Sequence, residues 1–329
     1  MRAARASIIC LSLVMAAACG PAPDPSPAVG TVAPLTVGAP LPDGRIVFDS
    51  DRAGSYGLYS MRADGGDIQL ITSDPGFDSW WPRVAPSRTQ ILFYRTPKGV
   101  HDLDYTKTAL WIVNPDGSGL RQLRATGADG WGLQGHAEWS PDGTQLVMFG
   151  GVPVNAQIFV TNADGTRPRQ VTNRPGMNLD PSWSPDGKSI VFAGCPQAAC
   201  FENDFEIYVA PAAGGDARRL TSDQIRDHDP YFSPDGRTIA WLARTDPAGP
   251  VGVWNIRAMN ADGSGQRAVT NDRHINSKPS WARDGSLIYF HRLEIGRSNW
   301  GIYSVRPDGT GMQELTKGVP GNSEYPSSP

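Results

Sequence analysis

The stretch Asp180-Pro181-Ser182-Trp183-Ser184-Pro185-Asp186-Gly187 decides the fold of this chain, because it recurs along the sequence. An apolar run at 190–192 follows it, then a second apolar run at 207–209, a glycine turn, and the closing triplet 219–221. Its first half returns, complete or degraded, at 82–87, 138–143, 231–236 and 280–285. A repeat of about fifty residues indicates a stack or ring of similar small units.

Within each unit the apolar runs are short and rich in Val, Ile, Phe, Tyr and Trp. Pro, Asp and Gly bound them, which are the residues that favour turns. No long stretch of helical periodicity follows the N-terminus. Four short antiparallel strands per unit are typical of a β-propeller blade, and the Asp-Gly pairs suit tight hairpin turns.

The two ends of the repetitive region are complementary. The chain finishes on 324–329, which opens a unit, and the globular part starts with 42–48, which continues one. Laid end to end, they restore one complete unit. We therefore expect an all-β fold, a six-bladed β-propeller of four-stranded antiparallel blades, with its ring closed by the C-terminal strand joining the N-terminal blade.

The W-S-P-D-G phrase, followed by I-x-x-x-x-x-D-G and L-T, resembles the WD-like repeat of TolB-type propellers. The resemblance covers 43–329. TolB itself carries a small α/β domain before its propeller, and a short linker occupies that place here. The resemblance implies a binding function in which an extended peptide enters the axial funnel.

The N-terminus predicts export. Arg2 and Arg5 precede an apolar stretch at 8–18 that is too short for a stable span, and Cys19 follows three alanines. We interpret 1–18 as a signal peptide, 19–42 as a lipidated Cys19 with a Pro/Ala-rich tether, and 43–329 as the propeller. An ordinary cleaved signal with an incidental Cys19 is the alternative. Gly20 favours the periplasmic face of the bacterial outer membrane over inner-membrane retention.

Cys195 and Cys200 would remain as a pair if Cys19 carries lipid. In an oxidising compartment a disulfide between them is the default. A metal site would need further ligands, and none is close in sequence; redox catalysis is the other alternative.

The net charge of the chain argues against nucleic acid as a partner. The formal net charge is -3, which provides no basic field for nucleic acid. We expect a monomer that meets the membrane only through its lipid anchor and that binds a protein or peptide of the cell envelope. No cofactor is expected, and the repeat tryptophans are interpreted as packing residues.

The sequence lacks H-E-x-x-H and G-x-S-x-G motifs. One constellation remains, since the first strand of each blade lines the axial channel. The residue just before each blade's Pro position should contribute to one ligand-binding channel mouth. These residues are Trp81, His136, Asp180, Asp229, Lys278 and Tyr325. Four non-repeat loops would set specificity, at 98–108, 194–203, 244–252 and 293–300.

Two other interpretations stay open. Asp180 and Asp229 follow the repeat, so they could simply satisfy turn amides. The fold also resembles oligogalacturonate lyases, which implies an enzyme or sugar-acid binder with one divalent metal on His136, His228 and His274. A basic residue, Lys278 or Arg273, would then meet a substrate carboxylate. We favour a non-enzymatic binding protein.

Overall fold

The structure is a computed structural model that describes residues 39–197, 204–223, 225–246 and 252–328. The predicted signal peptide (1–18), Cys19 and Cys200 lie outside these described residues. None of the helices in the described part is long and apolar enough to cross a membrane.

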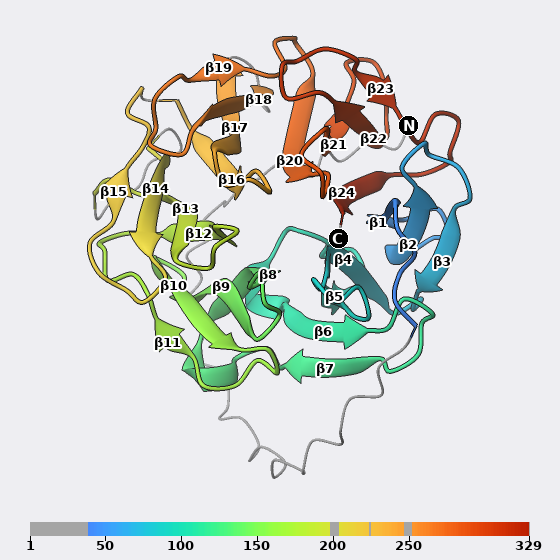
Figure 1. Cartoon of the computed structure of the whole chain (residues 1–329). Helices are drawn as coiled ribbons and strands as arrows, with labels where there is room; N and C mark the ends of the chain where they lie inside the picture. Colours follow the sequence, from blue (N-terminus) through green and yellow to red (C-terminus); the bar gives the residue numbers. More distant parts are fainter. Residues whose placement is uncertain (1–38, 198–203, 224, 247–251, 329) are drawn as a thin grey trace.

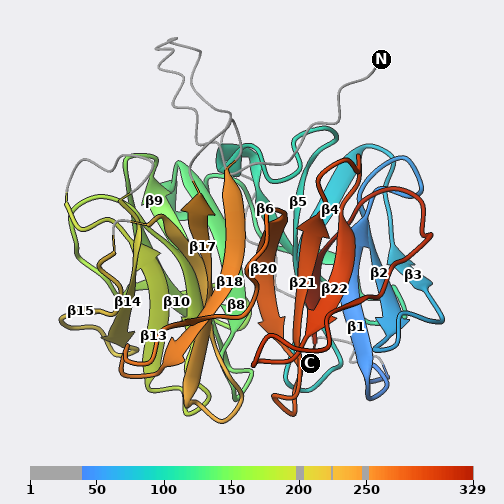
Figure 2. The same ribbon diagram turned by 90° about the horizontal axis from the view of Figure 1, so that it is seen from above.

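The described residues form β-sheets almost throughout, arranged around a common centre (Figure 1). Two short 3-10 helices, η1 (Tyr105–Lys107) and η2 (Ala128–Gly130), interrupt the connections. Turned by 90°, the molecule shows many of its strands running up and down between two end faces (Figure 2). The three sheets that follow the chain from its second repeat have four strands each: β4(Phe77–Val84), β5(Ile91–Pro97), β6(Ala109–Val113) and β7(Arg121–Arg124); β8(Leu133–Trp139), β9(Gln145–Val152), β10(Asn155–Asn162) and β11(Arg169–Gln170); β12(Asn178–Trp183), β13(Ser189–Gly194), β14(Glu206–Pro211) and β15(Arg218–Arg219).

The fourth four-stranded sheet joins the two ends of the chain. The C-terminal strand β24(Ser323–Ser327) pairs antiparallel with β1(Arg45–Ser50), which continues into β2(Gly57–Arg62) and β3(Gln69–Thr72). The side chains of β1 and β24 are buried along their whole length.

The expectation of six four-stranded blades closed into a ring is wrong. The described residues form four four-stranded blades, and the remaining strands make one eight-stranded sheet, without a hydrogen-bonded ring through all sheets. Its strands are β16(Asp227–Phe232), β17(Thr238–Asp246), β18(Val253–Asn260), β19(Arg267–Ala268), β20(Ile275–Trp281), β21(Ile288–Leu293), β22(Gly301–Val305) and β23(Gln313–Glu314). The hairpin of β17 and β18 is long, so Trp254 reaches Ile275 and pairs with it in parallel. That bridge merges two repeats that the sequence pattern separates.

The recurring Ser-Pro-Asp-Gly phrase forms the turn between the first two strands of a repeat. Ser184 Oγ donates to Asp186 Oδ1 at 2.6 Å and accepts from the Ser189 amide at 2.9 Å. Gly187 takes a left-handed φ of 69° that an L side chain would strain. Trp281 donates its indole N–H to the Tyr231 carbonyl of the neighbouring repeat at 3.1 Å. The phrase therefore serves as scaffold, packing one repeat on the next.

Candidate functional site

The six residues expected at the channel mouth share an unusual backbone conformation. Each has a left-handed φ between 50° and 57°, although none is glycine. Each lies where the pairing register of its strand shifts, in β4, β8, β12, β16, β20 or β24. A bulge of this kind re-aims a side chain, and the strained backbone costs on the order of 1 kcal/mol per residue. We call this set the axial cluster: Trp81, His136, Asp180, Asp229, Lys278 and Tyr325.

The bulges bring the axial cluster together at the centre of the molecule, where these six strands contact one another in succession (Figure 1). The rings of Trp81 and His136 stack with centroids 3.9 Å apart and an interplanar angle of 4°. Lys278 Nζ lies 4.6 Å from the centroid of Trp81 and 5.8 Å from that of Tyr325. All six residues are no more than 5% exposed, so the cluster fills the centre instead of lining an open funnel.

Asp180 is the hub of the polar contacts. Its Oδ1 pairs with His136 Nδ1, and its Oδ2 lies 2.7 Å from His228 Nδ1. Arg226 Nε donates to His228 Nε2 at 3.0 Å, so that nitrogen is an acceptor and Nδ1 carries the proton. Burial would raise the pKa of Asp180, but the two histidines outweigh it and hold the pKa well below its usual range. Burial lowers the pKa of His228 to about 4.

Asp229 has the opposite electrostatic balance. Burial raises its pKa to about 7, against the opposing effect of Lys278, whose Nζ lies 3.0 Å from Oδ1. Burial would lower the pKa of Lys278, but Asp229, Asp102 and Asp180 together raise it. The two neighbouring carboxyl groups, Asp180 and Asp229, therefore differ widely in proton affinity.

Sequence reasoning missed two members of this network, Asp102 and Tyr105, which lie in the connection before β6. The Tyr105 hydroxyl contacts Asp102 Oδ1 and lies 2.6 Å from His136 Nε2, and the Tyr325 hydroxyl donates to Asp102 Oδ2. The loop at 98–108 was singled out for its non-repeat sequence, but nothing in that sequence showed that these side chains turn inward. Arg226, a third missed member, directly precedes β16, and nothing in the sequence showed that its side chain meets His228.

A second buried group lies between β1 and β24. His101 Nε2 contacts Asp49 Oδ2 at 3.0 Å, and Tyr56 donates to Glu324 Oε1 at 2.8 Å. Burial, reinforced by Asp102, raises the pKa of Glu324 to about 8, while burial lowers the pKa of His101 to about 4. These groups form a polar layer under Tyr325.

The structure does not bring the three histidines of the metal alternative together. His136 and His228 meet on Asp180, whereas His274 Nδ1 accepts from the Ile295 amide at 2.9 Å. Both nitrogens of His228 are already engaged, which leaves no lone pair for a metal. The grouping whose ligand atoms lie within 4.8 Å of one another is instead His136, Asp180 and Asp229.

A small cavity adjoins the axial cluster. Its volume is about 40 Å³, and its lining includes the polar residues His136, Asp180, His228 and Lys278. Apolar side chains form the rest of the wall together with Tyr105: Leu133, Phe149, Met177 and Leu179. This volume accommodates a few water molecules or one small chemical group.

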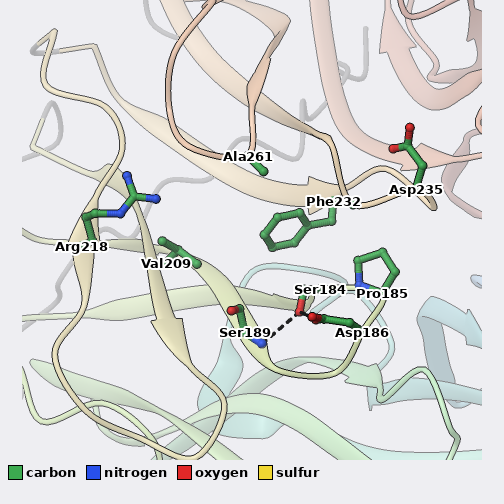
Figure 3. Close-up of a pocket in the computed structure, with 10 residues that line it drawn as sticks. Ser184, Pro185, Asp186, Ser189, Val209, Arg218, Phe232, Asp235 and Ala261 are labelled. Carbon is green, nitrogen blue, oxygen red and sulfur yellow. Dashed lines mark hydrogen bonds between the residues drawn. The ribbon is translucent and has the colours of Figure 1, made fainter.

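A larger groove, of about 460 Å³, lies at the Ser-Pro-Asp-Gly turns of two neighbouring repeats (Figure 3). Ser184, Asp186, Val209, Arg218 and Phe232 line it. Grooves of about 400 and 600 Å³ occupy corresponding places elsewhere, at the turns of Asp142 and Asp284. Because the groove recurs with the turn, it belongs to the scaffold.

Cys195 is buried and disulfide-bonded. The pairing with Cys200 stays a prediction, since Cys200 lies outside the described residues.

Comparison with known proteins identifies the domain type. Residues 122–248 match the family model described as TolB beta propeller domain. A Protein TolB homolog of Chlorobium luteolum is 31% identical over 152 residues, which cover 45% of this chain and 30% of the relative. Residues 122–248 thus match a TolB-type β-propeller domain, and the match to this relative spans less than a third of the relative's length.

Solved structures agree on the fold. TolB from Acinetobacter baumannii superposes with a TM-score of 0.67 at 18% identity, covering 86% of this chain and 66% of that chain. A putative TolB from Agrobacterium tumefaciens gives a TM-score of 0.61 at 20% identity, covering 82% and 87%. At these identities the likeness establishes the fold alone.

Proposed function

We propose that this chain is a non-enzymatic binding protein of the bacterial cell envelope, and that its partner is a protein or peptide. The observation that carries the proposal is the axial cluster. Six residues from six strands have left-handed backbone conformations, and their side chains meet at one place. Backbone strain gathered in one cluster of polar and aromatic side chains suggests a site and not a packing device.

Because the axial cluster is buried, only a small group of the partner can reach it. A peptide cannot thread between side chains that are at most 5% exposed. The cavity beside them is lined by the apolar side chains of Leu133, Met177 and Leu179 and by the polar side chains of His136 and Lys278. One small side chain or chain end of the partner fits that volume, while the neighbouring loops contact the rest.

The cellular location is part of the proposal. Cys19 would carry lipid after removal of 1–18, and 20–42 would tether the propeller to the periplasmic face of the outer membrane. Palmitate labelling of the expressed full chain, compared with a Cys19→Ala variant, tests this. Label that persists in the variant would contradict the anchor.

An enzyme or sugar-acid binder with a bound metal ranks second. The proximity of His136, Asp180 and Asp229 favours it. Against it, Lys278 Nζ already neutralises Asp229 at 3.0 Å, and His136 Nε2 is 2.6 Å from the Tyr105 hydroxyl. A cation entering there would face an ammonium group.

The binding site is tested by comparing two half-buried apolar positions. Leu179→Lys blocks the cavity, and Val209→Lys places the same charge in the scaffold groove of Figure 3. Envelope proteins that bind the immobilised full chain are identified by mass spectrometry, and each purified partner is titrated against all three forms. We expect Leu179→Lys to weaken the affinity at least about tenfold, and Val209→Lys to leave it unchanged.

A partner whose affinity is indifferent to Leu179→Lys would disprove the axial site. Turnover of oligogalacturonate by the wild type would disprove the non-enzymatic assignment instead.

A further inference from the structure

A second group of carboxyls, distinct from the axial cluster, lies where the sheet of β14 meets β16 (Figure 1). Ligand atoms of Glu206, Asp223 and Asp227 lie within 4.8 Å of one another. Glu206 and Asp227 are 2% and 1% exposed, and Asp223 is exposed. The backbone closes the junction, because the Asp227 amide donates to the Phe205 carbonyl at 3.0 Å.

Each buried carboxyl of this cluster has one engaged oxygen and one free oxygen. Arg219 donates to Glu206 Oε1, and Trp241 Nε1 donates to Asp227 Oδ1 at 2.8 Å. Glu206 Oε2 and Asp227 Oδ2 have no hydrogen-bond partner among the described residues. The Thr221 hydroxyl lies beside both carboxyls, but its single hydrogen can serve only one oxygen. Buried carboxylate oxygens without a partner are costly, so a cation or a shared proton would stabilise these two oxygens.

The neighbouring repeats show what usually fills this position. A threonine hydroxyl accepts from the amide of Ile158, Ile207 or Ile256 at 2.9 Å in three successive repeats, which places Gln157, Glu206 and Asn255 at equivalent sites. In the first of these repeats Asn178 Nδ2 donates to Gln157 Oε1 at 3.3 Å, and in the last Asn276 Nδ2 donates to Asn255 Oδ1 at 3.2 Å.

Glu206 and Asp227 replace such a pair of amides with two carboxyls. An amide pair supplies its own donor, whereas two carboxylates supply only acceptors. The substitution removes the N–H group that satisfies the junction in the other repeats.

In the next repeat, the acid that is equivalent to Asp223 has its negative charge paired with an arginine. Asp272, the equivalent of Asp223, accepts from Arg292 Nη1 at 2.7 Å, and the same nitrogen is 2.9 Å from Asn276 Oδ1. Arg292 stands opposite Asn276 in the strand register, but Ala243 stands opposite Asp227. The position opposite Asp227 therefore holds no arginine. The arginines of the Glu206 junction pair with the other two acids, Arg219 with Glu206 and Arg257 with Asp223, whose Nη1–Oδ2 distance is 3.3 Å.

We propose that Glu206, Asp223 and Asp227 bind a calcium ion. Calcium prefers oxygen ligands at 2.3–2.6 Å, so ligands on opposite sides of the ion are about 4.6–5.2 Å apart, in keeping with this cluster. Asp223 is exposed and opens the site to solvent, from which water completes the coordination. The ion would connect strands β14 and β16, which belong to different sheets. It would add to their side-chain contacts and to the hydrogen bond between the Asp227 amide and the Phe205 carbonyl. Magnesium, which requires a tighter octahedron, should bind more weakly.

The test is calcium titration of the metal-free full chain by calorimetry and by thermal unfolding. We expect a dissociation constant between about 10⁻⁵ and 10⁻³ M, and a rise in melting temperature of about 2–6 °C at saturating calcium. The double variant Glu206→Gln/Asp227→Asn recreates the amide pair of the neighbouring repeats, so it should fold and lose both responses. Asp216→Asn, an exposed acid of the same repeat, should retain them.

Asp223→Asn keeps the test decisive if the double variant does not fold, since it changes only an exposed side chain. It should weaken calcium binding at least about tenfold. A wild type without a calcium-dependent heat or stabilisation would overturn the proposal, and the two carboxyls would then share a proton. A calcium response that survives in the double variant would also overturn it, because the ion would bind elsewhere.

Discussion

Lys278 Nζ lies 3.0 Å from Asp229 Oδ1, in an ion pair that is buried between β20 and β16. Both residues hold left-handed backbone, with φ of 54° and 50°. The contact between these two side chains therefore requires a strained backbone conformation in each strand. Since Trp81 and Tyr325 lie against the same ammonium group, this pair connects the charged and aromatic halves of the axial cluster.

The first prediction concerns this pair. Lys278→Met leaves the Asp229 carboxyl buried without its cation, so the free energy of unfolding should fall by about 3–5 kcal/mol at pH 8. The loss should be smaller at pH 5, because Asp229, whose pKa is already about 7, takes up a proton. Urea unfolding at both pH values measures this. The double variant Lys278→Met/Asp229→Asn should recover much of the loss, and equal losses at the two pH values would contradict the assignment.

Glu324 predicts a pH dependence of stability. Its pKa is raised from 4.5 to about 8 in the folded chain, mainly by burial. Its stabilising effect is therefore fully present below about pH 4.5 and is lost as the pH rises to 8, by about 2–4 kcal/mol. Glu324→Gln should flatten that part of the profile in urea unfolding from pH 5 to 8, whereas the exposed Asp216→Asn should not. Asp229 leaves a residual slope of the same sign below about pH 7.

Arg226 contributes, after burial, to the low pKa of His228. Its Nε donates to His228 Nε2, and its charge is one of the causes that lower the pKa of that imidazole to about 4. Arg226→Met should raise the pKa of His228, because it removes both the donor and the charge. Histidine NMR titration detects the change. Arg226→Lys, which retains the charge, should raise it less; an unchanged value in both variants would show that burial alone sets the pKa.

The disulfide of Cys195 should be stabilising. If it closes the short loop to Cys200, as the sequence predicts, Cys195→Ser should cost about 2 kcal/mol of unfolding free energy. Mass spectrometry of unreduced peptides identifies the partner. A peptide that links Cys195 to any other cysteine would refute the predicted pairing, whatever the change in stability.

Much of the axial cluster could be predicted because it depends on the repeat. The six positions occupy the same place relative to the turn phrase. Aligning the repeats therefore identifies all six of them, from Trp81 to Tyr325. Asp102 and Tyr105 have no counterpart in the repeat, and only the packing of their loop on β8 brings them to His136. Tertiary contacts of that kind leave no periodic signal.

The number of separate sheets was not predictable for a related reason. A repeat specifies strands and turns, but the merging of two repeats depends on one bridge between Trp254 and Ile275. Strand length decides whether such a bridge forms, and strand ends are the least regular part of the sequence pattern. Burial of the six mouth residues likewise depends on neighbouring side chains and not on their own identity.

Because β24 pairs with β1, the first sheet cannot be completed until the C-terminal strand has been synthesised. Ser50 Oγ donates to the Asn322 carbonyl across a separation of 272 residues, so the first sheet stays incomplete until the end of the chain arrives. Contacts of such long range form late, because loop closure must precede them. The nascent N-terminal hairpin therefore keeps the edge of β1 unpaired until β24 has been made, and that edge is open to pairing with other strands during this interval.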